Sequence, residues 1–291
     1  MARVRNCWTH SKKATLIWAI SAIIFLCVFQ MALRNSSDNY HSTSSGHGTD
    51  TPTTNAEKRL RLYDKMERDL DEHGAVFLKH GETSQSLSLS DIFTLKDGSV
   101  TPILKAAIPP VRANVLYMST EHSVPISEVV RGIFLPYFEK VSWFQNSTLY
   151  HFSMFHASHH IAPVPATEQE IEAEANAVKT VVDALCPIKI VLDRVVLTST
   201  GVLLGCWQYD DAILHTSFAR LLGHPNTSPE EVDKTSELQF FHKLVARLNN
   251  ELRGFQATVS ELWYVEEFDM LALALNGRTK IRKFQLGCSK T

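Results

Sequence analysis

Apolar and polar positions divide the chain into an apolar run, a polar stretch and a long patterned region. Residues 14–33 are apolar except for Thr15, Ser21 and Gln30. About 20 such residues in a helix, each rising about 1.5 Å, cover the hydrocarbon core of a bilayer. Residues 34–56 are rich in Ser, Thr, Gly and Asn, and so polar a stretch buries too little apolar surface to fold. We therefore predict a transmembrane signal-anchor at 14–33 and a disordered stem at 34–56.

Helical periodicity recurs four times in the patterned region. Apolar residues three or four positions apart predict a membrane-proximal helix over 57–74 and a helix over 126–140. A third helix is expected from the capping box at Thr167 to about Leu185, and a fourth over 229–252.

Strands account for most of the remaining pattern. Runs rich in Val, Ile, Leu and Phe predict strands at 75–78, 113–118, 149–156, 189–196, 202–209, 213–219, 255–265, 270–275 and 280–286. We expect Pro109-Pro110 to interrupt the chain before the second strand and Asn276-Gly277 to form a type I′ hairpin turn. Because strands outnumber helices, we predict an α+β fold over 75–291, two-lobed, with mainly antiparallel sheets and flanking helices behind the transmembrane helix.

Charge sets the expected orientation of the chain. Four basic residues precede the apolar run: Arg3, Arg5, Lys12 and Lys13. Only Arg34 follows it closely, so the positive-inside rule places residues 1–13 in the cytosol and the remainder on the luminal side of the Golgi or another endomembrane. The predicted partner of residues 14–33 is then the lipid bilayer, in a type II, single-pass topology. The alternative is a signal peptide that is removed.

The net charge of −2 argues against DNA binding.

Glycosylation sequons and cysteines agree with a luminal domain. Sequons begin at Asn35, Asn146 and Asn226. Three thiols follow the apolar run: Cys186, Cys206 and Cys288. In an oxidising lumen they allow one disulfide and leave one cysteine over, and the sequence does not choose the pair. No Cys-x-x-Cys pair is present, which argues against a zinc ribbon or a thioredoxin-type site.

Candidate chemistry lies on two apolar strands that each carry a histidine and a serine. The motifs are His151-x-Ser153 and His215-x-Ser217. Residues i and i+2 of a strand point to the same face, so each strand would present an imidazole beside a hydroxyl. Histidine, with an ordinary pKa of about 6.5, serves as acid or base near neutral pH. A serine hydroxyl can donate a hydrogen bond to a phosphate oxygen as charge develops there.

At these residues the sequence resembles the two-histidine (2H) phosphoesterase superfamily, the RNA ligase/cyclic nucleotide phosphodiesterase family. Its mark is two His-x-Ser/Thr motifs on strands that face each other across a cleft, and the resemblance covers about residues 110–286. It implies hydrolysis of cyclic or 2′–5′ phosphodiesters of small nucleotides, with His151 and His215 catalytic, Ser153 and Ser217 binding substrate, and no metal or cofactor. Two features depart from the family: the histidines are closer in sequence than expected, and the helix over 229–252 follows the second motif.

Other readings of these residues stay open. A histidine on an apolar strand is often a hydrogen-bonded core residue, so a non-catalytic luminal domain for binding or scaffolding is one alternative. A further histidine group is His156, His159 and His160. Pro163 argues against the helix that a metal site with their spacing would need, so we expect loop histidines near the cleft mouth and no metal.

A Golgi glycosyltransferase is the second alternative, because a short tail, one span, a stem and a luminal domain are also typical of such enzymes. Those that use a metal carry an Asp-x-Asp motif. The one match, Asp69-Leu70-Asp71, lies in the membrane-proximal helix. The domain also lacks the alternating βα pattern of a nucleotide-sugar fold.

Overall fold

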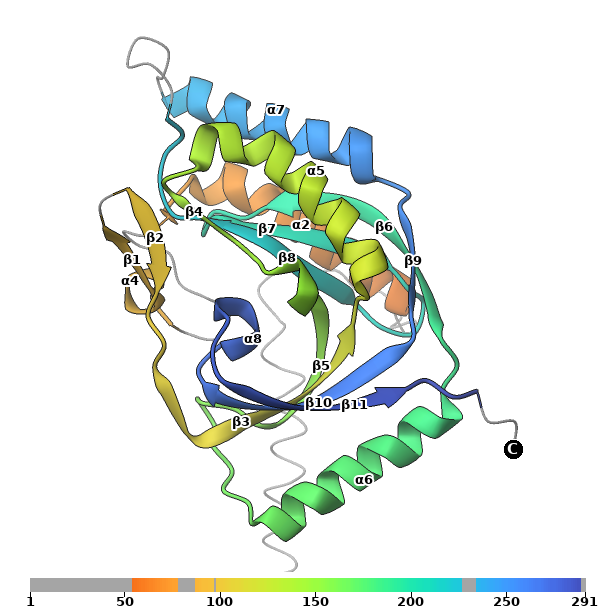
Figure 1. The fold of residues 1–291 in the computed structure, drawn as a ribbon. Coiled ribbons are helices and arrows are strands. Elements are labelled where there is room, and N and C mark those ends of the chain that lie inside the picture. Colours follow the sequence, from red (N-terminus) through yellow and green to blue (C-terminus); the bar gives the residue numbers. More distant parts are fainter. Residues whose placement is uncertain (1–53, 78–86, 97, 227–233, 289–291) are drawn as a thin grey trace, which may run out of the picture. The chain divides into compact units, whose positions relative to one another are not determined.

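The computed structural model describes residues 54–77, 87–96, 98–226 and 234–288 (Figure 1). The predicted anchor at 14–33, most of the stem and Asn35 lie outside these residues. Within the described ranges, no helix is both long enough and apolar enough to cross a bilayer.

Two antiparallel sheets organise the described residues. A four-stranded sheet has the order β11-β10-β3-β5 and a five-stranded sheet the order β4-β8-β7-β6-β9, while β1 and β2 form a separate hairpin. The strands are β1 Phe93–Lys96, β2 Ser99–Pro102, β3 Ala106–Tyr117, β4 Ser142–Phe144, β5 His151–Ser158, β6 Ile188–Leu197, β7 Val202–Gln208, β8 Leu214–Leu221, β9 Gln256–Val259, β10 Glu261–Asp269 and β11 Thr279–Gln285. The predicted α+β fold with antiparallel sheets is confirmed.

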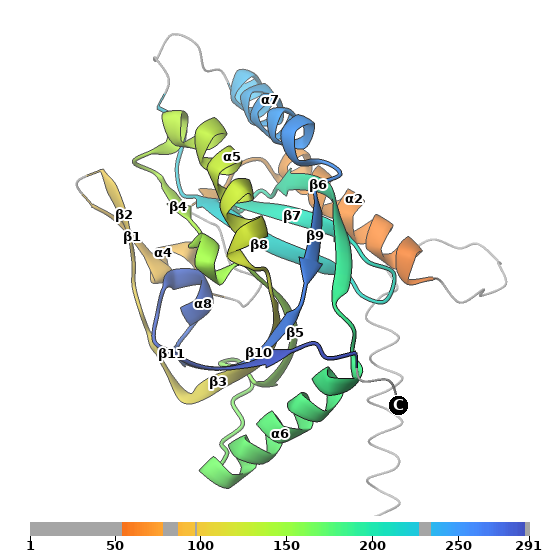
Figure 2. The same ribbon diagram turned by 45° about the vertical axis from the view of Figure 1, so that its right-hand side comes forward.

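Helices flank both sheets. They are α2 Asn55–His73, α4 Leu89–Ile92, α5 Thr120–Phe138, α6 Glu168–Ala184, α7 Lys234–Leu252 and α8 Ala272–Leu275. Helices α5 and α7 contact each other and the five-stranded sheet, as Figures 1 and 2 show, whereas α6 lies against β10 and β11 of the other sheet.

Local sequence explains where the predicted helices begin and end. Helix α2 starts at a capping box in which Thr54 and Glu57 each accept the other's backbone N–H, and it ends at Gly74, whose φ of 69° favours glycine. Helix α6 starts at the same kind of box, between Thr167 and Glu170. Both helices match the prediction, as does α5 apart from an earlier start.

Side-chain alternation along β7 separates the two faces of the five-stranded sheet. Leu203 and Trp207 join the main core with α5 and α7. Leu204 and Cys206 join a second cluster, which includes Tyr63 of α2. Because successive strand residues point to opposite faces, α2 covers the face opposite α5 and α7.

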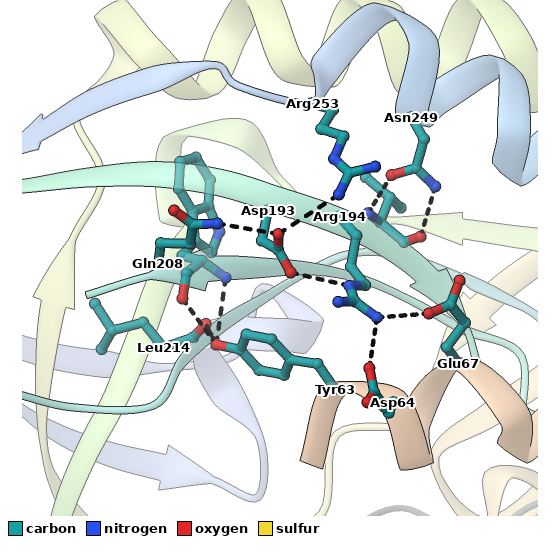
Figure 3. A network of polar contacts seen from close by, with 11 residues as sticks. Tyr63, Asp64, Glu67, Asp193, Arg194, Gln208, Leu214, Asn249 and Arg253 are labelled. Carbon is teal, nitrogen blue, oxygen red and sulfur yellow. Dashed lines mark hydrogen bonds and ion pairs between the residues drawn. The ribbon is translucent and has the colours of Figure 1, made fainter. Parts of the chain in front are cut away.

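Polar contacts fix α2 on that face (Figure 3). The buried hydroxyl of Tyr63 donates toward the carbonyl oxygens of Leu214, at 2.5 Å, and Trp207, at 3.0 Å. Arg194 of β6 donates to Asp64 at 2.9 Å and to Glu67 at 2.6 Å. The helix is therefore pinned beside the start of β8, next to His215.

Two predicted strands are wrong. Residues 75–77, the described part of the strand expected at 75–78, form no strand. The strand expected at 270–275 is a turn that contains α8, and Asn276 in the left-handed region ends that helix. Asn276-Gly277 is therefore no two-residue hairpin turn, since β10 and β11 are joined by a longer loop.

Two strand boundaries also differ. The single strand expected at 255–265 is divided between β9, which pairs with β6, and β10, which pairs with β3. Strand β3 begins at Ala106 and runs through Pro109-Pro110, which we expected to interrupt it. The prolines are tolerated because they fall where the pairing of β3 with β10 shifts register.

The cysteines that the sequence left unassigned are resolved. Cys186, just after α6, forms a disulfide with Cys288 after β11. Cys206 is a buried free thiol on β7, and burial raises its pKa to about 12.

Candidate functional site

The two predicted motifs lie on strands of different sheets that contact each other, β5 and β8. In each motif the middle residue, Phe152 or Thr216, is buried on the opposite side of its strand. Ser153 and His215 are exposed, and His151 and Ser217 are half-buried. The prediction that each histidine shares a face with its serine agrees with this alternation.

A hydrogen bond to the backbone orients His151. Its Nδ1 donates to the carbonyl oxygen of Leu149 at 2.8 Å, so the neutral ring carries its lone pair on Nε2. Burial lowers the pKa of His151 below 6.5, and the charge of His215 lowers it further. The imidazole is therefore neutral at neutral pH and can accept a proton at Nε2.

His215 lies one residue into β8, where solvent reaches its ring. Partial burial of the ring lowers the pKa of His215 below 6.5. Because β5 and β8 contact each other, the charge of His215 also lowers the pKa of His151.

A β-bulge in β8 adds Arg220 to the face of His215 and Ser217. Consecutive residues of β7 pair with Ser217 and Ala219, so Phe218 is left without a partner. An extra residue reverses the alternation of side chains beyond it. Accordingly His215, Ser217 and Arg220 line the same hollow.

A matching bulge in β5 adds His156 to the face of His151 and Ser153. Consecutive residues of β3 pair with Ser153 and Phe155, which leaves Met154 out. His151, Ser153 and His156 together line a small hollow. The two strands thus carry the same arrangement: histidine, serine two residues on, and a basic side chain five residues on.

Arg220 is a cation without a counter-charge. Its Nη1 is buried and has no hydrogen-bond partner, and no carboxylate of the described residues lies within ion-pair distance. Burial lowers its pKa to about 10. Buried charges are normally paired, and a guanidinium binds phosphate or carboxylate oxygens in two-pronged fashion. An anion beside Ser217 would supply the missing partner.

These residues line three adjoining hollows. The hollow of His151, Ser153 and His156 has a volume of about 40 Å³. The next, about 20 Å³, and the third, about 400 Å³, share Ser217 and Arg220. Leu271 and Ala274 line both the 40 Å³ hollow and the 20 Å³ hollow. The α8 segment therefore lies between the two motifs.

Glu267 of β10 is a second group at the site, besides Arg220, that sequence reasoning missed. Its Oε1 accepts the backbone N–H of Leu273 at 2.8 Å, and its carboxyl lines the hollow of His151. Burial raises its pKa to about 7. No motif marks Glu267 or Arg220, because the β10–β3 pairing places the first and the bulge in β8 places the second.

The three histidines expected in a loop are divided. His156 is in β5 and lines the hollow of His151, whereas His159 and His160 follow the strand. The rings of His156 and His159 are 5.1 Å apart, and those of His159 and His160 4.3 Å. Within the described ranges, no three His, Cys, Asp or Glu side chains are arranged to hold a metal.

The two carboxylates of the Asp-x-Asp match contact different partners. Asp69 accepts the N–H and the hydroxyl of Ser199, each at 2.7 Å, and Asp71 contacts Nε2 of His242 at 2.7 Å. Leu70 between them is in the core. These carboxylates stabilise the fold and do not converge on one point.

Two predicted sequons fall on described asparagines. Asn146 accepts hydrogen bonds from the N–H and the hydroxyl of Thr148, at 3.0 and 2.8 Å, at the start of a short 3-10 turn. Asn226 is exposed.

Comparison with known proteins gives no family for this chain. No protein-family model matches it, and no curated protein matches it. Among solved structures, TT0787 of Thermus thermophilus is 11% identical with a TM-score of 0.42, over 62% of this chain and 100% of that chain. ATU0111 of Agrobacterium tumefaciens str. C58, a conserved protein of unknown function, is 9% identical with a TM-score of 0.39, over 61% and 86%. Likenesses this remote carry no argument about function.

Proposed function

We propose that this chain is a metal-independent phosphodiesterase of the two-histidine type, acting on cyclic or 2′–5′ phosphodiesters. One observation carries the proposal: two His-x-Ser strands from different sheets contact each other, and the unpaired guanidinium of Arg220 lies on the face of the second motif. A phosphodiester is an anion that needs a base, an acid and a counter-charge for its oxygens, and these residues supply all three.

In the proposed reaction, His151 is the base. A water oxygen attacks phosphorus while Nε2 of His151 takes the water proton. The bond from phosphorus to the leaving oxygen breaks, and His215 gives that oxygen a proton. The hydroxyls of Ser153 and Ser217 and the guanidinium of Arg220 hold the non-bridging oxygens as their charge grows.

The same proposal includes a type II, single-pass membrane protein with its catalytic domain in the lumen of the Golgi or another endomembrane. The apolar run at 14–33 supports it. So do the exposed sequon residue Asn226 and the Cys186–Cys288 disulfide, because disulfides persist in oxidising compartments. In this proposal the two sheets are the two lobes that carry one motif each.

The test is hydrolysis of 2′,3′-cyclic nucleotides by the purified chain with a chelator present. We expect activity that His151→Ala and His215→Ala each reduce by a factor of about 10²–10⁴, the usual contribution of a general acid or base. His242→Ala, which changes an exposed histidine of α7, is the control and should keep full activity. Folded variants that are as active as the parent, or a parent with no activity, would contradict the proposal and favour the non-catalytic binding domain.

The pH dependence of the reaction follows from the two histidines. The base acts only when neutral, so kcat/KM falls as the pH drops below its pKa, and the acid acts only when protonated, so kcat/KM falls as the pH rises above its pKa. Both pKa values lie below 6.5. We therefore expect a bell-shaped profile of kcat/KM with its maximum on the acid side of 6.5. A maximum on the alkaline side would argue against this pair, and Ser153→Ala should lower the rate without moving the maximum.

A further inference from the structure

The largest of the three hollows extends away from the motifs and toward α2. It has a volume of about 400 Å³, within the usual size range of small-molecule sites. His215, Ser217 and Arg220 line one end. The 2H resemblance begins near residue 110, so α2 is an addition to the part of the chain that the resemblance covers.

Apolar side chains form the wall that α2 and β7 contribute. They are Leu62, Met66, Val202 and Leu204, which belong to the cluster between α2 and the sheet. The wall is held in place, because Tyr63 and the Arg194 ion pairs pin the helix on either side of Met66 (Figure 3). A ligand here would meet a preformed apolar surface beside a cation.

The polar groups of the hollow favour an anionic ligand. Asp69 also lines it, but its Oδ2 already accepts two hydrogen bonds from Ser199. Lys65 is exposed at the rim and forms no ion pair with any of the described residues. The hollow therefore carries two positive charges, Arg220 in the depth and Lys65 at the edge, against the single carboxylate of Asp69.

We propose that this hollow binds the large apolar group of a phosphate ester whose phosphate lies at Arg220. The inference rests on the proposed function for the phosphate and adds the substrate class: an ester with one bulky group, either a nucleoside or an alkyl chain. The other two hollows hold only about 20 and 40 Å³, so the bulk of the ligand lies on the α2 side.

Binding of three phosphate esters to the full chain tests this inference by calorimetry. Adenosine 2′-monophosphate carries a nucleoside, hexyl phosphate an alkyl chain, and methyl phosphate neither. We expect at least one of the two larger esters to bind tenfold or more tightly than methyl phosphate, and the stronger of the two identifies the group. Arg220→Gln should weaken all three.

Two variants narrow the hollow from α2. Met66→Trp and Lys65→Trp should each reduce the advantage of the larger ester over methyl phosphate by about tenfold. Met66→Trp should keep the affinity for methyl phosphate, whereas Lys65→Trp also removes a positive charge and should weaken all three esters. Leu60→Trp is the matched control, because Leu60 is exposed on the same helix and does not line the hollow. Lys65 is exposed, so its variant keeps the test decisive if Met66→Trp does not fold.

The outcomes separate this inference from the proposed function. If methyl phosphate binds as tightly as the larger esters, or if neither narrowing variant reduces their advantage over methyl phosphate, the α2 hollow is overturned and the phosphate site stands. If no ester binds, or if Arg220→Gln binds all three as the parent does, the phosphate site fails and this inference fails with it.

Discussion

The carboxyl group of Glu267 links the chemistry of single residues to the stability of the domain. The unfolded chain releases this proton near its ordinary pKa of 4.5, whereas burial holds it in the folded chain to about pH 7. Folding therefore binds a proton between these values, and the contribution of Glu267 to stability falls as the pH rises from 4.5 to about 7. Above that pH its contribution stays constant.

We predict that Glu267→Gln removes this loss, because an amide keeps an oxygen for the N–H of Leu273 and does not ionise. The variant should gain about 2–3 kcal/mol of unfolding free energy relative to the parent between pH 5 and pH 8, at about 1.4 kcal/mol per unit of pKa shift. Urea unfolding at both pH values measures it. Glu128→Gln, at an exposed position of α5, should differ from the parent by the same unfolding free energy at both pH values. If Glu267→Gln also differs from the parent by the same amount at both, the prediction is contradicted.

Period-two alternation was enough to place each histidine beside its serine, since it depends only on strand geometry. It was not enough for Arg220 and His156. In an unbroken strand both would point away from their motif, and the bulges at Phe218 and Met154 reverse them. A bulge depends on the pairing of two strands, so one strand's sequence does not reveal it.

Among the elements, α6 is held to the four-stranded sheet by an ion pair whose arginine is buried. Arg112 of β3, 2% exposed, donates to Glu174 of α6 from Nε at 2.9 Å and from Nη2 at 3.1 Å. Its Nη1 donates to the carbonyl oxygen of Val164 at 2.8 Å, and Tyr264 donates to Glu174 at 2.6 Å. The sheet face under the first half of α6 is therefore polar.

We predict that Arg112→Ala destabilises the domain by about 2–4 kcal/mol, because it leaves Glu174 without its cation in a partly buried place. Amide hydrogen exchange in α6 should quicken first. Lys179→Ala breaks an exposed pair with Asp183 on the same helix and should cost less than about 0.5 kcal/mol. Equal effects of the two substitutions would contradict a special role for Arg112.

Capping boxes and periodicity predicted α2 and α6 closely because their signals are local. The stretch at 270–275 misled the prediction for a physical reason. Its apolar run suits a strand or a helix equally well, and tertiary contacts decide: Trp143 and Gln145 donate to the carbonyl oxygens of Ala274 and Leu273. The division of 255–265 between two sheets has the same origin, in partners far away along the chain.

At the scale of the whole molecule, the disulfide joins two positions separated by 102 residues. It clamps the segment after β11 onto the end of α6, where Cys288 N–H also donates to the carbonyl oxygen of Leu185 at 3.1 Å. A cross-link over so long a loop removes much conformational freedom from the unfolded chain, which is worth about 2–4 kcal/mol in typical domains.

We therefore predict that reductant lowers the unfolding free energy of the parent by about 2–4 kcal/mol. Urea unfolding with and without dithiothreitol measures the change. The double variant Cys186→Ser with Cys288→Ser should already show the lower value and should not respond to reductant. A parent whose stability is unaffected by reductant would show that the bond does not form.

The docking of α2 has a consequence for synthesis on the ribosome. The hydroxyl of Tyr63 and the carboxylate of Asp64 meet their partners Leu214 and Arg194 across sequence separations of 151 and 130 residues. At about 5–20 residues per second, the helix leaves the exit tunnel roughly 7–30 s before those partners do. Until β6 and β7 have emerged, the apolar face of α2 has no native surface to cover it, so a nascent chain arrested before β6 should present α2 to a chaperone.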